Sequence, residues 1–343
     1  MSPLRVGVIG VGHLGREHAR IYASLPGCVL AGVVDTHEGR GKEIAVRHGV
    51  PLFARPEDLF GKVDAVSVVV PTRAHFAVAK PFLERGIPCL VEKPITATVE
   101  EAEAMVALAK SSGAILQIGH VERFNPAVQA YFRAPRIIPR FIEAQRISPY
   151  PFRSTDVGVV LDLMIHDLDI VLHLANSPVQ SIEALGLNVL SRTEDLANAR
   201  IRFENGCVAD LTASRVALKT LRQVRLFSAE AYLVIDYRRQ EARFYRKSER
   251  LLRGEVKVED VPRESVKDAR AFVFGELLNV ETLRVPRVEP LASELESFIE
   301  CVRDRKAPLV PGEHGLRALR AAVEIQRQIR ACLSPPPAPK AGQ

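Results

Sequence analysis

Residues 4–15, LRVGVIGVGHLG, join a short apolar strand to a glycine-rich turn and the start of a helix. In such a turn the first glycine permits a sharp bend, the second lets the backbone approach a pyrophosphate, and the third lets helix and strand pack closely. The helix start offers free N–H groups to the anion. A lone G-x-G-x-x-G is weak evidence, but this one opens an alternation of strands and helices and therefore predicts a dinucleotide site. The predicted cofactor contacts in the turn are Gly10, Gly12, His13, Leu14 and Gly15.

The first 120 residues alternate short apolar segments with amphipathic ones. Strands are expected at 4–9, 29–34, 65–70, 89–91 and 114–118, and helices at 15–25, 40–48, 75–85 and 99–111. The run AVSVVV at 65–70 needs both faces buried, as in a parallel sheet. Thr98 and Glu101 resemble a capping box, and Gly113 ends that helix. The pattern predicts the α/β class, with a doubly wound parallel sheet (a Rossmann domain) over residues 1–120.

After residue 120 the rhythm changes. A helix is expected at 158–175, and Asn205-Gly206 between two apolar runs is a strong hairpin signal. The other expected elements are the hairpin strands 199–203 and 207–213, a second hairpin of 222–227 and 231–237, and helices at 291–303 and 315–332. We therefore expect an α+β domain with a mixed or antiparallel sheet over residues 121–333. A Pro- and Ala-rich tail at 334–343 is expected to be disordered.

The composition excludes several classes of protein. The net charge is +6, from 47 Lys and Arg against 41 Asp and Glu, but the basic residues are interleaved with acidic ones, so no nucleic-acid-binding stripe emerges. The five cysteines are scattered without a C-x-x-C pair, which disfavours a disulfide framework, a zinc ribbon or a redox dithiol. The chain shows neither a signal peptide nor a run of about 20 apolar residues. The sequence predicts a soluble, cytoplasmic protein with no nucleic-acid or membrane partner.

The second strand ends in Asp35, twenty residues after Gly15. A carboxylate at this position can accept hydrogen bonds from both ribose hydroxyls of the adenosine half of a dinucleotide. It would repel a 2′-phosphate, so the sequence favours NAD over NADP. A surface aspartate that starts a turn is the alternative, and the nearby Arg40 leaves the choice of cofactor partly open.

The tripeptide Glu92-Lys93-Pro94 follows an apolar strand. Ligands of a doubly wound sheet bind beyond the carboxyl ends of its strands, so Lys93 should point toward the nicotinamide. A lysine there can hydrogen-bond a substrate hydroxyl and stabilise a developing alkoxide. The alternative is that Glu92-Lys93-Pro94 is only the charged end of a strand, with no role in binding or catalysis.

Asp162 and His166 lie four residues apart in a mostly apolar predicted helix, so one helix face carries both. A histidine suits proton exchange with an alcohol, and the carboxylate can orient it. A satisfied core His–Asp pair is the alternative. His173 is seven residues from His166, roughly 10 Å along the axis and too far to share an ion, so we expect no metal site. Structural roles are expected for Asp167, Asp169 and His173.

The motifs GVIGVGHLG, VPTRAH, EKP and DLMIHD together resemble the Gfo/Idh/MocA oxidoreductases over nearly the whole chain. The resemblance implies that Lys93 and His166 flank the substrate carbon beside the nicotinamide, with Asp162 as the supporting carboxylate. It also implies a second domain with a large open, mostly antiparallel sheet, whose outer face forms subunit interfaces of a homo-oligomer, a dimer or tetramer. Further positions that would line the cofactor are Pro71, Thr72, His75 and Glu92.

A narrower resemblance lies in GHVERFNP, residues 119–126. It is similar to the branch of the family that oxidises nucleotide sugars, of the UDP-N-acetylglucosamine 3-dehydrogenase type. Arg123 would then contact substrate or close the domain boundary, and Asn125 would offer its amide to a sugar hydroxyl. The alternative is that these residues begin a helix with Pro126 in its first turn.

These observations predict an NAD-dependent oxidoreductase that converts a secondary hydroxyl of a sugar nucleotide to a ketone. His166 would remove the hydroxyl proton while hydride passes to the nicotinamide, and Lys93 would stabilise the alkoxide. Gly12, Lys93 and His166 should then share one cleft. The resemblance favours a cis Lys93–Pro94 bond, although a trans bond would leave the mechanism intact. The alternatives are an inositol or free-sugar dehydrogenase, an NAD-dependent glycosidase, and a catalytically silent dinucleotide-binding regulator.

Overall fold

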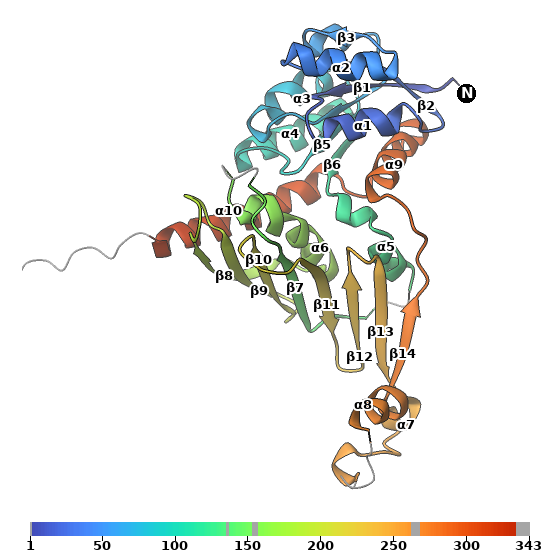
Figure 1. The fold of residues 1–343 in the computed structure, drawn as a ribbon, viewed down its shortest axis with the longest axis vertical. Coiled ribbons are helices and arrows are strands. Elements are labelled where there is room, and N and C mark those ends of the chain that lie inside the picture. The colour runs from blue at the N-terminus through green and yellow to red at the C-terminus, as the bar shows by residue number, and fades with distance from the viewer. Residues whose placement is uncertain (1, 135–136, 153–156, 262–267, 334–343) are drawn as a thin grey trace, which may run out of the picture. The chain divides into compact units, whose positions relative to one another are not determined.

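The computed structural model describes residues 2–134, 137–152, 157–261 and 268–333 (Figure 1). These residues form two compact units. The first holds the chain up to Phe124 together with Val288–Val323, and the second holds Asn125–Arg287 together with the chain from Glu324 onward. The predicted disordered tail lies outside the described residues.

The sheet of the first unit is parallel throughout the described residues, with strand order β3-β2-β1-β4-β5-β6. Its strands are β1 (Leu4–Ile9), β2 (Cys28–Val34), β3 (Leu52–Phe53), β4 (Ala65–Val68), β5 (Cys89–Glu92) and β6 (Leu116–Gly119). Its early helices are α1 (Gly15–Tyr22), α2 (Glu38–His48), α3 (His75–Leu83) and α4 (Val99–Ser112), with 3-10 turns at Pro56–Leu59, Thr72–Ala74 and Val121–Phe124. The predicted doubly wound sheet is confirmed. The strand order reverses beside β1, the kind of position where such sheets bind ligands.

Local signals set the ends of these elements as expected. The Thr98 side chain accepts a hydrogen bond from the Glu101 N–H at 3.2 Å and starts α4, and Gly113 ends it with φ +69°. Every residue of β4 is buried, because a strand in the middle of a parallel sheet is covered on both faces.

The segment Val288–Val323 packs on the first unit, whereas the sequence places it in the second domain. It contains α9 (Pro290–Asp304) and the first part of α10 (Gly312–Leu333). Leu295 and Phe298 of α9 are fully buried in the hydrophobic core that also contains Val6 of β1. An apolar helix face predicts burial but not the core that will receive it, which explains the difference.

The second unit is built on an eight-stranded sheet of order β14-β13-β12-β11-β7-β10-β9-β8 within the described residues. Its strands are β7 (Phe141–Ile147), β8 (Val179–Leu187), β9 (Leu196–Phe203), β10 (Val208–Ser214), β11 (Leu221–Phe227), β12 (Ala231–Asp236), β13 (Glu241–Lys247) and β14 (Leu278–Leu283). Both predicted hairpins form, the first turning at Gly206 with φ +81°. The pair β7–β10 is parallel and the other neighbours are antiparallel, so the large, mostly antiparallel sheet is confirmed.

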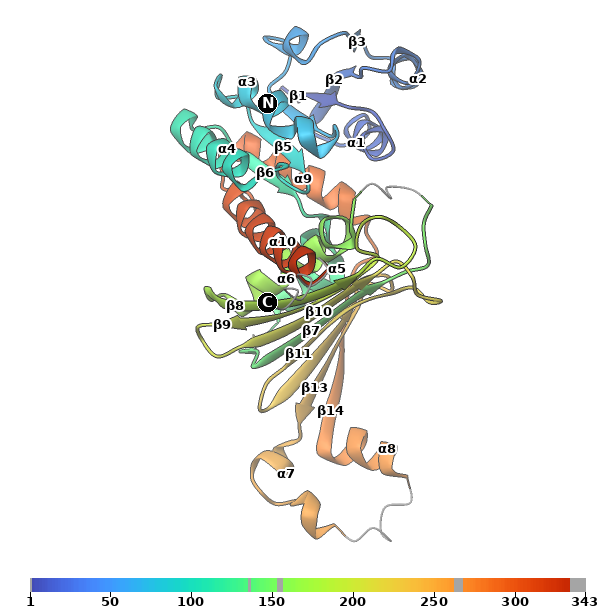
Figure 2. The same cartoon turned by 90° about the vertical axis from the view of Figure 1, so that its left-hand side faces the viewer.

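Helices cover one face of this sheet. Figure 2 shows α5 (Pro126–Arg133) and α6 (Ile165–Ala175) on the same side of the sheet. Every second residue of β7 is buried, including Ile142 and Ala144, as expected for a strand with one covered face. A π-helical turn, Val160–Met164, precedes α6. The remaining helical segments are α7 (Glu249–Leu252), α8 (Ala269–Phe272), a 3-10 turn at Val258–Asp260 and a π turn at Val273–Leu277. Figure 1 shows α7 and α8 beyond the ends of β13 and β14.

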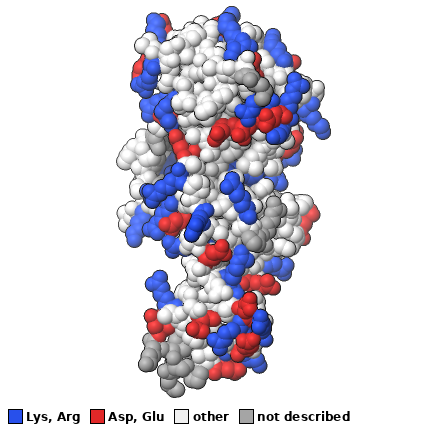
Figure 3. All heavy atoms as spheres, turned by 90° about the vertical axis from the view of Figure 1, so that its right-hand side faces the viewer, with Lys and Arg blue, Asp and Glu red and all other residues white. Residues whose placement is uncertain are grey.

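Charged side chains of both signs are interspersed over the face drawn in Figure 3. Among the described residues, no helix combines the length and apolar character that crossing a membrane requires.

Candidate cofactor and catalytic site

The three glycines of the glycine-rich turn have different structural roles. Gly10 has φ +86°, and a Cβ there would lie 2.5 Å from the Val69 carbonyl oxygen. A Cβ on Gly15 would collide with the Gly10 carbonyl, whereas one on Gly12 would meet nothing within 4 Å. The first and third glycines therefore keep the turn closed, and Gly12 leaves open space where a pyrophosphate can approach. Between them His13 and Leu14 are exposed.

Asp35 is held at the end of β2 and points its carboxylate at the turn. It accepts hydrogen bonds from the backbone N–H groups of Val11 at 2.8 Å and His37 at 2.7 Å, and Arg40 pairs with it at 2.7 Å. Burial disfavours the charged carboxylate, but these hydrogen bonds outweigh it and hold the Asp35 pKa below its ordinary value. An ionised acceptor thus stands beside the glycine turn, as ribose recognition requires.

Glu92 is buried at the end of β5 with two partners. His18 of α1, which the sequence analysis missed, places Nε2 3.1 Å from Glu92 Oε1, and the Lys93 backbone N–H donates to Oε2 at 3.2 Å. The carboxylate fits because the neighbouring residue is Gly119, where a Cβ would lie 2.8 Å away. The Lys93–Pro94 bond is cis, as predicted.

His75 contacts backbone through both ring nitrogens. Nδ1 lies 2.9 Å from the Pro94 carbonyl oxygen and Nε2 lies 2.9 Å from that of Val70. Burial lowers the pKa of the imidazole, although the two carbonyls act in the opposite direction. His75 thus ties the segment after β4 to the segment after Lys93. The exposed Pro71 and the half-buried Thr72 begin the 3-10 turn that precedes His75.

The second unit carries Asp162 and His166. Asp162 lies in the π turn and His166 in the first turn of α6. Both are half-buried, whereas the intervening Met164 and Ile165 are buried. The helix therefore presents both predicted catalytic side chains on its more accessible side. The π turn was not predicted, although such turns are frequent at functional sites.

Asp167 has the structural role predicted for it. It pairs with Arg146 of β7 at 2.8 and 3.0 Å, and both side chains are only 3% exposed. His173, farther along α6, packs edge-on against Phe132 of α5 with ring centroids 4.9 Å apart. These contacts fix α6 on the sheet.

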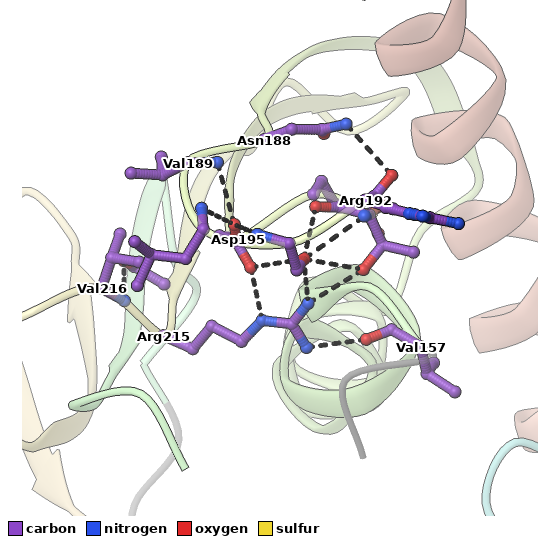
Figure 4. Close-up of polar contacts among 12 residues, drawn as sticks. Val157, Asn188, Val189, Arg192, Asp195, Arg215 and Val216 are labelled. Carbon is purple, nitrogen blue, oxygen red and sulfur yellow. Dashed lines mark hydrogen bonds and ion pairs between the residues drawn. The ribbon is translucent and has the colours of Figure 1, made fainter. Parts of the chain in front are cut away.

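A polar network anchors the start of the same helix (Figure 4). One Asp195 oxygen accepts hydrogen bonds from the backbone N–H groups of Val189, Leu190 and Ser191 at 2.6–2.8 Å. Arg215 binds the other oxygen at 2.7 Å and donates to the Val157 carbonyl at 2.8 Å. Burial opposes ionisation, but these donors hold the Asp195 pKa far below its ordinary value.

The adjacent Glu194 extends the anchor into the helix. Its backbone carbonyl accepts from the Val159 N–H at 3.0 Å, and its carboxylate accepts from the Val160 N–H at 3.3 Å. A Cβ on Gly158 would collide with that carboxylate. A carboxylate at a helix N-terminus is electrostatically favourable, so Glu194 helps to fix the turn that carries Asp162.

Arg123 and Asn125 have protein partners. The Arg123 guanidinium is fully buried in the first unit, where Nη2 donates to the Leu309 carbonyl at 3.4 Å. Asn125 caps α5, accepting from the Ala127 N–H at 3.1 Å and donating to the Tyr237 carbonyl at 3.0 Å. These contacts fit the start-of-helix interpretation, and the substrate roles of Arg123 and Asn125 stay predictions.

Two consecutive segments of the chain match models of one protein family. Residues 4–120 match the oxidoreductase family with an NAD-binding Rossmann fold, and residues 117–234 match the GFO/IDH/MocA C-terminal domain. The UDP-N-acetylglucosamine 3-dehydrogenase of Acidithiobacillus ferrooxidans is 36% identical over 97% of this chain and 99% of its own length. The chain belongs to the GFO/IDH/MocA oxidoreductase family.

Solved structures and a second relative agree with this membership. A structure of the Acidithiobacillus ferrooxidans enzyme superposes with a TM-score of 0.86 and covers 97% of this chain and 100% of that one, at 35% identity. The scyllo-inositol 2-dehydrogenase (NAD(+)) of Bacillus subtilis is 30% identical over 90% of this chain and 88% of its own. As a GFO/IDH/MocA protein, the chain is a dehydrogenase that uses NAD, and the open glycine turn and Asp35 fit that cofactor.

Proposed function

We propose that this dehydrogenase oxidises the C3 hydroxyl of UDP-N-acetylglucosamine, or of a close UDP-sugar, to a ketone. The observation that carries the proposal is the likeness to the Acidithiobacillus ferrooxidans enzyme, which spans essentially both chains, including the sheet unit that carries Asp162 and His166. A shared Rossmann unit alone would support only a shared cofactor.

In this proposal three side chains perform the chemistry on the substrate. His166 accepts the proton of the sugar hydroxyl, Asp162 orients its imidazole, and the Lys93 ammonium stabilises the oxygen as negative charge develops. When bound, NAD supplies the acceptor for the hydride that leaves the same carbon. The partial exposure of Asp162, Lys93 and His166 in their units supports these roles, because a catalytic group must be reachable.

An inositol or free-sugar dehydrogenase is the second candidate, favoured by the 30% identity to the Bacillus subtilis enzyme. The deciding experiment measures NADH formation with a panel of UDP-sugars, free sugars and inositols. We expect the highest kcat/KM with UDP-N-acetylglucosamine. Each reaction is repeated with a 2-oxo acid as hydride acceptor. NADH that stays tightly bound to the enzyme would otherwise hide turnover. Turnover confined to inositols would overturn the proposal, and release of a leaving group without net NADH would indicate a glycosidase.

We expect NAD to bind at least about tenfold more tightly than NADP, a difference of about 1.4 kcal/mol. The reason is the ionised Asp35 carboxylate, which would accept hydrogen bonds from the ribose hydroxyls and repel a 2′-phosphate. Titrating both reduced cofactors by fluorescence measures the ratio. The Asp35→Asn substitution removes the repulsion of the 2′-phosphate and leaves Arg40 in place. The ratio of NAD affinity to NADP affinity should therefore become smaller. Equal affinities in the unchanged protein would contradict the role of Asp35.

We propose that the protein is a homo-oligomer assembled through the sheet face opposite α5 and α6. On that face Phe141, Phe227, Tyr232 and Tyr245 form an aromatic ladder with successive ring centroids 5.9, 5.6 and 4.2 Å apart. Partly exposed aromatic side chains in a continuous row are typical of protein interfaces. Light scattering after size-exclusion chromatography should give the molar mass of a dimer or tetramer. Tyr232→Glu, which places a charge in the aromatic row, should lower that molar mass toward the monomer value. A monomeric wild-type protein would refute the assembly.

We also propose that the protein works in the cytoplasm. All five cysteines, which lie within the described residues, are free thiols, as expected in a reducing compartment. Cell fractionation with an antibody against the protein tests this, and recovery outside the cytoplasm would refute it.

A further inference from the structure

His18 and Glu92 form a buried pair that the proposed chemistry does not use. His18 is fully buried on α1, and Glu92 is 7% exposed at the end of β5. Their side chains meet at 3.1 Å between Nε2 and Oε1. Burying a carboxylate and an imidazole is costly unless each finds a partner. The free-energy cost of burying these two groups suggests that the contact between α1 and the end of β5 has a function.

The contact joins His18 Nε2 to Glu92 Oε1, and an ionised carboxylate at this position accepts a proton that His18 carries on Nε2. Nδ1 of His18 has no hydrogen-bond partner among the described residues, so the ring is held through Nε2. The other Glu92 oxygen accepts the Lys93 backbone N–H at 3.2 Å. One carboxylate therefore joins His18 to the backbone of Lys93.

We propose that His18 is a positioning residue for Lys93, acting through Glu92. His18 lies one turn after Gly15, so the pair links the helix that begins at the phosphate-binding turn to the strand end that carries Lys93. The pair also sets the orientation of the carboxyl group of Glu92, the residue directly before Lys93. The inference rests on the catalytic role proposed for Lys93, but it can be tested without the substrate.

Two amide substitutions separate donation from polarity. In His18→Gln the amide nitrogen takes the place of Nε2 and can reach Glu92, whereas in His18→Asn it takes the place of Nδ1 and cannot. We expect kcat to fall about tenfold to a hundredfold in His18→Asn, as for loss of a hydrogen bond to a charged group, with a much smaller change in the sugar KM. His18→Gln should recover most of the loss.

Tyr22→Phe is the matched control. Tyr22 lies one turn farther along α1, is equally buried, and its hydroxyl meets the Ser67 hydroxyl at 2.9 Å. Its substitution by Phe removes a buried hydrogen bond from the same helix, while it keeps the aromatic ring that lies edge-on to His18. We expect kcat within about twofold of wild type in Tyr22→Phe. A fall equal to that of His18→Asn would show that α1 packing, not the His18–Glu92 contact, matters.

A substrate-free readout keeps this inference apart from the proposed function. Lysines are reductively methylated with ¹³C, and the Lys93 signal is assigned by its disappearance in Lys93→Met. We expect the signal to shift in His18→Asn, to return toward its original position in His18→Gln, and to stay in place in Tyr22→Phe. An unmoved signal in folded His18→Asn would overturn the positioning role. Absence of turnover with the UDP-sugars, together with a moved signal, would overturn only the proposed substrate.

Discussion

Replacing His166 by Asn lowers kcat by about 10²–10⁴, the usual range for losing a general base. Asn keeps a polar side chain of smaller but comparable size in the half-buried first turn of α6, so folding should be nearly unchanged. Cofactor affinity should also hold, because the residues proposed to bind the cofactor, the glycine turn and Asp35, are unchanged. Steady-state kinetics, fluorescence titration of NADH and thermal denaturation measure the three quantities.

His173→Asn is the matched control for this variant. His173 lies on the same helix and packs against Phe132, so it should retain wild-type turnover. Lys93→Met, which keeps the chain length and removes the charge, should lose activity to a degree comparable with His166→Asn. Near-normal turnover in His166→Asn would mean that His166 is a core histidine and that the base lies elsewhere.

The Rossmann unit was predictable because its signals are local. The alternation of apolar runs, the Thr98 cap and Gly113 depend on neighbours within a few residues, and all appear in the structure. The packing of α9 on the first unit and the parallel β7–β10 pair depend on segments far apart in the chain. No periodicity reports such pairings, so the sequence left them open.

The candidate site divides in a similar way. The glycine turn, Asp35 and the Glu92-Lys93-Pro94 strand end were found because each follows a predicted strand. His75, Arg123 and Asn125 were also selected by their motifs, and the structure shows each of them in a hydrogen bond within the protein. A motif marks the groups that hold its shape as well as those that touch a ligand. His18 was missed because its partner is 74 residues away.

Replacing Arg215 by Met destabilises the protein by about 3–5 kcal/mol, the usual cost of leaving one member of a buried ion pair uncompensated. Arg215 is 1% exposed and Asp195 fully buried, so water cannot replace the lost guanidinium. Urea denaturation followed by circular dichroism measures the change. Arg200→Met is the matched control, because the Arg200–Asp210 pair at 3.0 Å is 43% and 30% exposed and should contribute less than about 1 kcal/mol.

The double variant Arg215→Met/Asp195→Asn isolates the charge as the cause. With both charges removed, part of the lost stability should return. The penalty then comes from the Asp195 carboxylate, which keeps its backbone N–H donors but has lost its counter-ion, rather than from lost volume. Acid provides a second test. Asp195 has a pKa below its unfolded value of about 3.9, so its contribution is complete above that pH and is lost as the pH falls toward the folded pKa. Asp195→Asn alone should therefore flatten the loss of stability on acidification. A double variant no more stable than Arg215→Met, with an unchanged acid slope, would show that the network contributes through packing alone.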